Sequence, residues 1–545
     1  MPTERSNYWL RAISRRRLLQ ASAMSAGALA VSAACGDSSS SSKTPAGGNT
    51  PAGSASPAAS ASAAVKKGGT VRYGNTVDFS WSNMPYSVNS FYYVQEFAVY
   101  DTLFRYNDAA SLEPTPRLAK GYEFNADKTE IVVELKPNLT FHDGKRLDAQ
   151  AVVDSFVSLN DTATPPSQVQ GVAKAYISKA EAVDPLHVKF TLVRPGNVVF
   201  DVFHWWLIAD AANIDPLSKG GLPNGSGPFK VTSVQPKQGA KLAAFEGAWQ
   251  PPHLDGLEYK IYPDAAGLAL AMRSGAIDMA KELSADDAKV FGSDGKHNLF
   301  SDKGLASVYC MGMNTKGEVT KDVRIRQALH HSLDRERVSE EVLLGAGQPF
   351  HCLWPTTSKA YESRYDANPF DLKKAKELVT AAGYENGTPD VEVMLSSDDY
   401  GGKQIFQILQ ADAKQAGVNL KINQVERSAF SPKFQKATYP GCYMTTFGYN
   451  ATYPDTLFVM NFQVRVPNST AFESDEYKKF QADMAAAGDD ETRAGLYEQF
   501  NKIWDDNMWV LLSSSRRLQW VTSKDVANLS INDYSMPDLA GVGMA

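Results

Sequence analysis

Strands and helices alternate in strict order between residues 391 and 447, and this order limits the folds open to the chain. Residues 391–395, 418–425 and 442–447 have the length and the apolar side chains expected of strands, and helical spacing marks 401–416 and 428–436 between them. A βαβαβ order requires right-handed crossovers and builds an open, doubly wound sheet. The sequence therefore predicts an α/β fold whose ligands gather beyond the carboxyl ends of the strands.

Elements of the same kinds recur earlier in the chain. We expect a strand at residues 129–136, a helix at 147–159, and further strands near 186–192, 229–234 and 257–262. A chain of 545 residues has room for more than one domain. Two α/β lobes with a cleft between them are the most economical arrangement, and such clefts are favoured ligand pockets.

Two helices with acidic caps are predicted in the second half. Asp371 is expected to cap a helix that ends at Gly383. Asp322 is expected to cap a longer helix, in which helical spacing relates Ile325, Ala328, Leu329, Ser332 and Leu333.

The first 34 residues resemble a twin-arginine export signal. Arg15 and Arg16 precede an Ala-rich apolar run that ends at Ala34. That run is too short and too weakly apolar to span a membrane stably. The signal peptide is therefore assigned to residues 1–34.

A lipid tether is predicted directly after the signal. The sequence Ser32-Ala33-Ala34-Cys35 resembles a bacterial lipobox, with Ser32 in place of the usual leucine, so Cys35 is the expected lipidation site. Residues 35–67 are then the lipidated cysteine and a Ser/Ala/Pro linker that cannot bury enough apolar surface to order itself.

Composition and motifs exclude several classes of protein. A formal charge of -6 argues against nucleic-acid binding, which needs basic patches. No GxSxG, HExxH or phosphate-binding glycine loop is present, so we predict no enzyme activity, no cofactor and no metal site. His142 is expected to hydrogen-bond its own turn. Beyond Cys35, the cysteines Cys310, Cys352 and Cys442 allow at most one disulfide and are expected as buried thiols.

Six blocks in order give the chain a strong resemblance to the bacterial extracellular solute-binding proteins of family 5, which serve peptide, nickel and other solute importers. The blocks begin at Leu112 and run through the Phe141-His142-Asp143-Gly144 turn to the segment before Tyr384. They comprise residues 112–119 with 129–136, 139–145, 225–229, 323–329 with 333–335, Gly345 with Pro349, and 375–378 with 382–384.

The resemblance implies a two-lobed periplasmic-binding-protein fold of type II, with a ligand cleft between the lobes. Lobe 1 would take residues 68–305, including an inserted subdomain at about 101–215. Lobe 2 would take 306–500, and residues 501–545 would return to lobe 1. Lobe closure around the ligand would follow the hinge-bending mode of this class.

Candidate ligand contacts come from both sides of that cleft. In peptide-binding relatives the loop after the last strand of lobe 2 contacts the ligand. Here Thr452 stands where the family's aspartate pairs with a peptide's free amino group. A buried ammonium without a counter-charge costs about 3–5 kcal/mol, so free-amine peptides in the usual pose are not expected unless Asp455 substitutes. The full set of candidates is Asp78, Phe79, Trp81, Tyr86, Trp205, Phe447, Tyr449, Asn450, Thr452, Tyr453 and Asp455.

The resemblance implies the substrate-binding protein of an ABC importer. It would capture a peptide-like or other organic solute outside the cytoplasm and deliver it to a permease and ATPase complex, as a monomer held to the membrane by its lipid. A ligand-presenting module for a membrane sensor and, less favoured, a metal-chelate carrier are the alternatives. Eight histidines without a cluster argue against the carrier.

Overall fold

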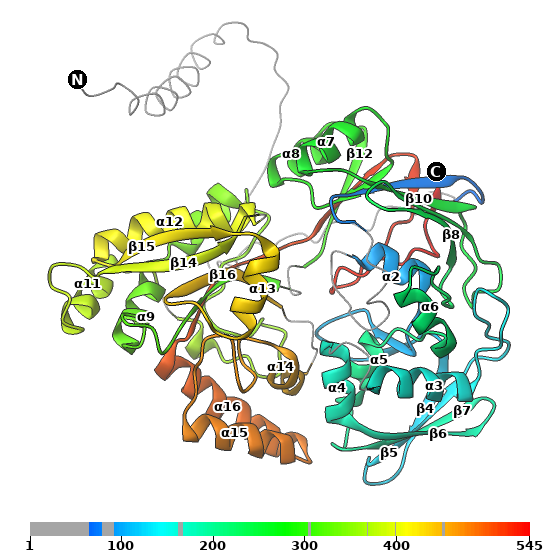
Figure 1. Cartoon of the computed structure of the whole chain (residues 1–545), viewed down its shortest axis with the longest axis horizontal. Helices are drawn as coiled ribbons and strands as arrows, with labels where there is room; N and C mark the ends of the chain where they lie inside the picture. The colour runs from blue at the N-terminus through cyan, green and yellow to red at the C-terminus, as the bar shows by residue number, and fades with distance from the viewer. Residues whose placement is uncertain are drawn as a thin grey trace, which may run out of the picture. The chain divides into compact units, whose positions relative to one another are not determined.

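The computed structural model describes residues 65–78, 92–161, 167–303, 307–367, 369–397, 399–448 and 453–545, with nothing stated of the Tyr400 side chain. Its largest sheet has seven strands (Figure 1). Their order is β12 (His297–Ser301), β18 (Gln519–Ser523), β11 (Met279–Lys281), β1 (Thr70–Asn75), β10 (Gly256–Ile261), β9 (Gly239–Ala244) and β8 (Phe229–Gln235). Strand β1 runs parallel to both of its neighbours, and the outer strands pair antiparallel.

A second sheet has five strands and contains the predicted alternation. Its order is β15 (Asn419–Val425), β14 (Asp390–Ser396), β16 (Cys442–Gly448), β13 (Ser307–Met313) and β17 (Val510–Ser515). The three strands predicted from the βαβαβ pattern are parallel, with β14 between the other two. Strands β13 and β17 extend them as antiparallel partners. The predicted α/β fold is therefore confirmed, as a mixed sheet.

Helices α12 (Tyr400–Ala416) and α13 (Arg427–Gln435) connect the parallel strands. The apolar face of α12 is buried in the core with β14, and the helix ends at Gly417, whose positive φ of 95° suits glycine. The long helix expected after Asp322 is shorter than predicted. Helix α9 (Val323–His331) ends before Ser332, because Asp334 caps a separate turn, α10 (Arg335–Arg337).

A four-stranded antiparallel sheet lies within the range expected for the inserted subdomain. Its order is β4 (Ala119–Phe124), β5 (Glu130–Leu135), β7 (His187–Leu192) and β6 (Ile177–Asp184). Helices α3 (Ala149–Asn160), α4 (Gln168–Tyr176) and α5 (Val199–Trp205) lie over one side of this sheet (Figure 1). Asp148 and Ser167 cap α3 and α4 by accepting backbone N–H groups of the first turn.

The chain passes between the two large sheets at two places that lie side by side. One segment joins β12 to β13, and the other joins β17 to β18. The backbone N–H of Arg516 in the second segment donates to the carbonyl of Ser307, at the end of the first, over 2.8 Å. These two segments are the hinge connections of the fold.

The C-terminal return differs from the expected boundary at residue 501. Helix α16 (Asp490–Asn507) buries Phe500 and Trp504 in the same core as β17, and β17 pairs with β13 in the five-stranded sheet. The return to the seven-stranded sheet therefore begins after Ser515, because the apolar face of α16 is covered by the second sheet's core.

The buried carboxylate of Asp101 accepts several hydrogen bonds at the start of the inserted subdomain. Asp101 is 1% exposed. Its oxygens accept from Arg117 Nε and Nη2 at 3.0 Å, from Arg105 Nη2 at 3.2 Å, and from Trp249 Nε1 at 2.7 Å. Burial alone would raise the pKa of Asp101, but the two guanidinium groups outweigh it and the pKa is lowered.

We predict that Asp101→Asn destabilises the fold by about 3–5 kcal/mol, because two buried guanidinium groups lose their carboxylate. A carboxyl whose folded pKa is lowered contributes stability above its unfolded pKa of about 3.9, and loses it as pH falls through the folded value. The loss should therefore be full at pH 7 and shrink in strong acid. Urea unfolding measures it, with Asp215→Asn in the exposed Lys219 pair as the control. Equal effects of the two substitutions would contradict the assignment.

Candidate ligand-binding site

Parallel strands in both large sheets provide the edges at which ligands collect in open α/β folds. In the seven-stranded sheet β1 runs parallel to β11, so the segments after Asn75 and Lys281 leave the same edge. In the five-stranded sheet β14 runs parallel to β16, so the segments after Ser396 and Gly448 leave the same edge. Side chains that follow these four strands are the first candidates to line a ligand cleft.

One buried group of side chains brings these strand ends to the hinge connections. We call Lys281, Glu282, Tyr309, Asp399 and Arg516 the hinge cluster. Arg516 Nη2 lies 2.5 Å from Glu282 Oε2, and Lys281 Nζ lies 3.6 Å from Glu282 Oε1. Tyr309, on β13, and Asp399, the N-cap of α12, act electrostatically on Arg516 from the other sheet. The cluster therefore joins charged and polar groups of both sheets at the point where the chain crosses.

The opposite charges of the hinge cluster stabilise one another's ionised forms. Burial opposes the charge of Arg516, but Glu282, Tyr309 and Asp399 outweigh it and raise the pKa of Arg516. Burial likewise opposes the charge of Glu282, and Arg516 with Lys281 outweighs it and lowers the pKa of Glu282. Both groups are thus ionised at neutral pH. Buried ionised groups with such shifts are typical of functional sites, although structural networks show them too.

Aromatic rings line the Lys281 side of the cluster. Lys281 Nζ lies 5.4 Å from the ring centroids of both Tyr93, in α2 (Tyr93–Val99), and Trp520, in β18. The side chain is nearly inaccessible, and burial lowers the pKa of Lys281 against the opposing effect of Glu282. A cation between two ring faces gains stabilisation without a further carboxylate. Both rings and Lys281 are buried, so this side of the cluster belongs to the core.

Two of the residues predicted from the sequence lie in the first sheet and the insert. Asp78 follows β1, and its carboxylate accepts the backbone N–H of Lys237 at 3.0 Å. Trp205 is 4% exposed and packs edge-on against His204 and Tyr534 within the main core. Asp78 therefore lies at a strand end where ligands collect, whereas Trp205 serves the core.

Three others belong to the second sheet and the helix that follows it. Phe447 is fully buried in the core around β17. Tyr453 is the N-cap of α14 (Pro454–Met460), with Lys359 Nζ 4.9 Å from its ring. Asp455 is fully buried, with Arg493 Nε at 3.0 Å from Oδ2 and the Tyr497 hydroxyl on Oδ1. Both oxygens of Asp455 are therefore engaged by α16, which leaves it unsuited to replace the missing aspartate at position 452.

The remaining predicted residues fall outside the described part of the chain. They are Phe79, Trp81, Tyr86, Tyr449, Asn450 and Thr452 in the expected cleft, and Arg15, Arg16 and Cys35 in the export and lipidation signals.

Sequence reasoning did not find the hinge cluster. Lys281 is the last residue of a strand of three residues, which is too short for a periodic signal, and Glu282 follows it. Arg516 lies between two strands without a motif. A helix N-cap at Asp399 is the one local signal, because Asp before a helical run is a preferred cap. Only strand pairing brings these positions together.

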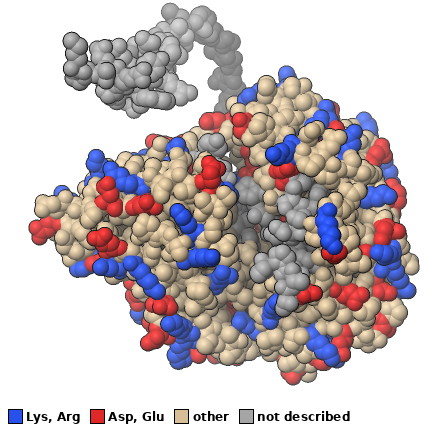
Figure 2. All heavy atoms as spheres, viewed as in Figure 1, with Lys and Arg blue, Asp and Glu red and all other residues tan. Residues whose placement is uncertain are grey.

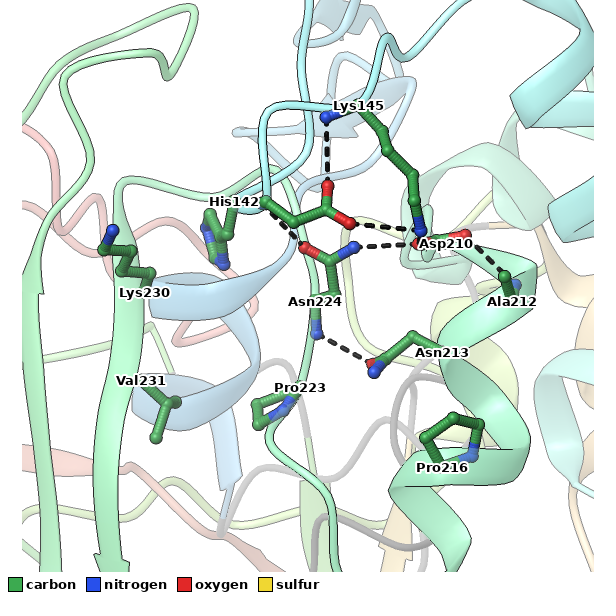
Figure 3. A pocket seen from close by; sticks show the side chains of 11 residues that line it. His142, Lys145, Asp210, Ala212, Asn213, Pro216, Pro223, Asn224, Lys230 and Val231 are labelled. Carbon is green, nitrogen blue, oxygen red and sulfur yellow. Dashed lines mark hydrogen bonds and ion pairs between the residues drawn. The ribbon is translucent and has the colours of Figure 1, made fainter.

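A surface pocket of about 460 Å³ lies elsewhere, beside the Phe141–Lys145 turn (Figure 3). Its polar groups bind one another: Lys145 Nζ lies 2.9 Å from Asp210 Oδ2, and Asn224 Nδ2 donates to the same oxygen at 2.8 Å. Asn224 also accepts the N–H of Asp143. This network fixes the turn against the segment before β8, so the pocket is structural.

His142 in that turn is neutral at physiological pH. Burial lowers the pKa of His142 to about 4. Its Nε2 lies 3.1 Å from the Gly227 carbonyl, and Nδ1 accepts the N–H of Gly225 at 3.4 Å. His142 therefore bonds the 225–227 segment, and the expectation that it would hydrogen-bond its own turn was wrong. Its two ring nitrogens are both used, which is the pattern of a structural histidine.

The described residues include three free cysteines and a surface of mixed charge. Cys310, Cys352 and Cys442 are free, buried thiols. No group of three or more His, Cys, Asp or Glu in this part of the chain is placed to hold a metal. Within the same residues, no helix is long and apolar enough to cross a bilayer. Acidic and basic side chains are interspersed over the face in Figure 2, without a continuous basic patch.

The family model for bacterial extracellular solute-binding proteins, family 5 (middle region), matches residues 113–470. The chain belongs to this family. It is 26% identical to the glutathione-binding protein GsiB of Pectobacterium atrosepticum over 77% of this chain and 83% of that protein. It is 27% identical to the dipeptide-binding protein of Escherichia coli K12 over 73% and 80% of the two chains.

Solved structures give the same fold. The PBP AgaA of A. tumefaciens R10, in complex with agropinic acid, superposes with a TM-score of 0.75 at 21% identity, over 88% of this chain and 99% of that chain. The fold is therefore the predicted type II periplasmic-binding-protein fold, and the predicted family is confirmed. Members of this family are binding proteins rather than enzymes, and the chain is the substrate-binding protein of an ABC importer that works outside the cytoplasm.

We predict that Glu282→Gln weakens binding of the solute about tenfold or more, because it removes the carboxylate charge that lies 2.5 Å from the Arg516 guanidinium. Arg516 would then lose the carboxylate that orients it. Isothermal titration with the solute released from the purified protein measures the change. Asp287→Asn, which truncates the peripheral Arg273 pair, is the matched control and should keep wild-type affinity. Unchanged affinity in Glu282→Gln would exclude the hinge cluster from the site.

Proposed function

We propose that the chain captures a polar organic solute of peptide-like size between its two large sheets and releases it to a membrane permease and ATPase complex. The observation that carries this proposal is the hinge cluster. Strand ends of the first sheet and elements of the second converge there on Arg516. Charged groups of both signs, Arg516 and Glu282, suit a solute with polar and charged groups.

The comparisons support the class of solute. Two relatives are a glutathione-binding protein and a dipeptide-binding protein, and one structural neighbour was solved with agropinic acid. All three are organic molecules with carboxylates. Thr452 replaces the aspartate that pairs with a peptide amine in the family, which favours a solute without a free amine at that position. We propose that the protein acts as a monomer, without cofactor or catalysis, by closing around the solute.

We predict that the protein purified without denaturant carries a bound solute, which native mass spectrometry detects as an added mass lost at higher collision energy. A thermal-shift panel of dipeptides, glutathione, agropinic acid, nickel–histidine and oligosaccharides then identifies its class. A ligand at 100 times its Kd stabilises the folded state by about 2.7 kcal/mol. The nickel complex as the sole hit would favour a chelate carrier. Turnover of any panel compound, or no binding throughout, would contradict the proposal.

The proposed tether rests on the N-terminal signals. Export through the twin-arginine route would use Arg15 and Arg16, and a diacylglyceryl group on Cys35 would hold the protein to the membrane. We predict that Cys35→Ser moves the protein from the membrane fraction to the soluble extracytoplasmic fraction, and that replacing Arg15 and Arg16 with Lys retains the precursor in the cytoplasm. Cell fractionation with immunoblotting measures both. A membrane-bound Cys35→Ser protein would contradict the lipid anchor.

A further inference from the structure

Helix α14 contributes side chains to the cores of both large sheets. Its cap Tyr453 and its last residue Met460 are buried in the core that contains the seven-stranded sheet and the insert. Leu457 and Phe458, on the other side, are buried in the core around β17 and α16. In chain order α14 belongs to the second sheet, because it follows β16 and precedes the return at Ser515. This helix is therefore packed between the two halves of the fold.

Polar bonds hold the first turn of α14 to the inserted subdomain. Asp201, on α5, is fully buried, and its Oδ2 lies 2.5 Å from Thr456 Oγ1 and 3.2 Å from the backbone nitrogen of Tyr453. The hydroxyl of Tyr176, at the end of α4, lies 2.8 Å from the same Thr456 oxygen. Because Thr456 donates to the carboxylate, it accepts from Tyr176. Two helices of the insert thus bind one turn of α14.

A second bond joins the same two regions. Arg493 Nη2, on α16, donates to the carbonyl of Pro195 at 3.1 Å, while its Nε binds Asp455 in α14. Arg493 is 4% exposed. The contact between the insert and the second sheet's helices is therefore buried and hydrogen-bonded.

Rotation about the hinge connections has to break these bonds. Asp201 and Tyr176 belong to the part of the chain before Ser301, and Tyr453, Thr456 and Arg493 belong to the part between the two connections. In the closed arrangement the Asp201 carboxylate accepts hydrogen bonds from two donors of α14, and in an open arrangement water would replace these donors. A hydrogen bond within the protein contributes a net stabilisation after its exchange with water is counted, so these bonds favour the arrangement in which they are made.

We propose that Asp201 is a positioning residue that latches α14 to the inserted subdomain and thereby sets the balance between open and closed forms. The inference rests on the proposed closure mechanism, and it assigns the insert a role in it. Asp201 acts through Tyr453 and Thr456 and needs no contact with the solute.

Distances between spin labels test the latch without knowledge of the solute. Val183→Cys in the insert and Lys421→Cys on β15 place labels at positions 60% and 62% exposed. The background carries Cys35→Ser. The remaining cysteines are buried, and burial raises the pKa of Cys352 and of Cys442 to about 12, so they react poorly with the label. Pulsed electron paramagnetic resonance on solute-free protein then gives the open and closed populations.

We predict that Asp201→Asn and Thr456→Val each shift the ratio of open to closed forms about tenfold or more towards open, since the first removes the negative charge that strengthens the bonds to α14 and the second removes one of those bonds. Asp210→Asn is the matched control, because it neutralises another buried carboxylate of the insert whose partners, Lys145 and Asn224, lie on the same side of the hinge. It should keep the wild-type distances. Melting temperature is recorded for every variant, since a purely structural role would lower it and leave the distances unchanged.

Superimposable distances in wild type and Thr456→Val would overturn the latch, and this variant decides the matter if Asp201→Asn does not fold. The proposed function fails differently. If the wild-type distances do not change with any bound solute, the protein does not close and the proposed function fails. If both variants close as the wild type does, only the latch proposal fails.

Discussion

The hydrogen bond from the Arg516 backbone to the Ser307 carbonyl joins the two segments that connect the large sheets, and the rest of the structure is arranged around this point. The two segments lie side by side, so a change of angle between the sheets would turn about this point and would separate α14 from one of the two cores that it enters. The Arg516 side chain forms an ion pair with Glu282 of the first sheet. Tyr309 and Asp399 of the second sheet act on it electrostatically. In the proposed function, a solute bound beside this cluster is coupled to the angle between the sheets through Arg516.

The buried polar contacts of the molecule are of two kinds, those within one half of the fold and those that join the halves. Some stay within one half of the fold, such as Asp101 with its two arginines and the network of Lys145, Asp210 and Asn224 (Figure 3). Others join the halves, and the bonds from Asp201 to α14 are of this kind. Buried polar groups are costly unless paired, so contacts that must open are expected where water can replace the lost partner.

The sequence predicts much of the fold because its signals are local. The strands at 391–395, 418–425 and 442–447 lie where apolar runs of strand length place them, and ordered motifs identify the family. The extent of α9 and the late return at Ser515 depended on an alternative cap at Asp334 and on which core covers α16, and neither is a local property. The site was harder still. Asp78 could be placed from a strand end, but Arg516 and Glu282 become neighbours only through pairing of strands 234 residues apart.

A crystal structure of the protein with the solute it carries from gentle purification tests the central claim most directly. The account predicts that the solute lies beyond the carboxyl ends of β11 and β14, within hydrogen-bonding distance of at least one member of the hinge cluster. A solute bound instead in the pocket beside His142 and Lys230, or on the outside of either sheet, would contradict it.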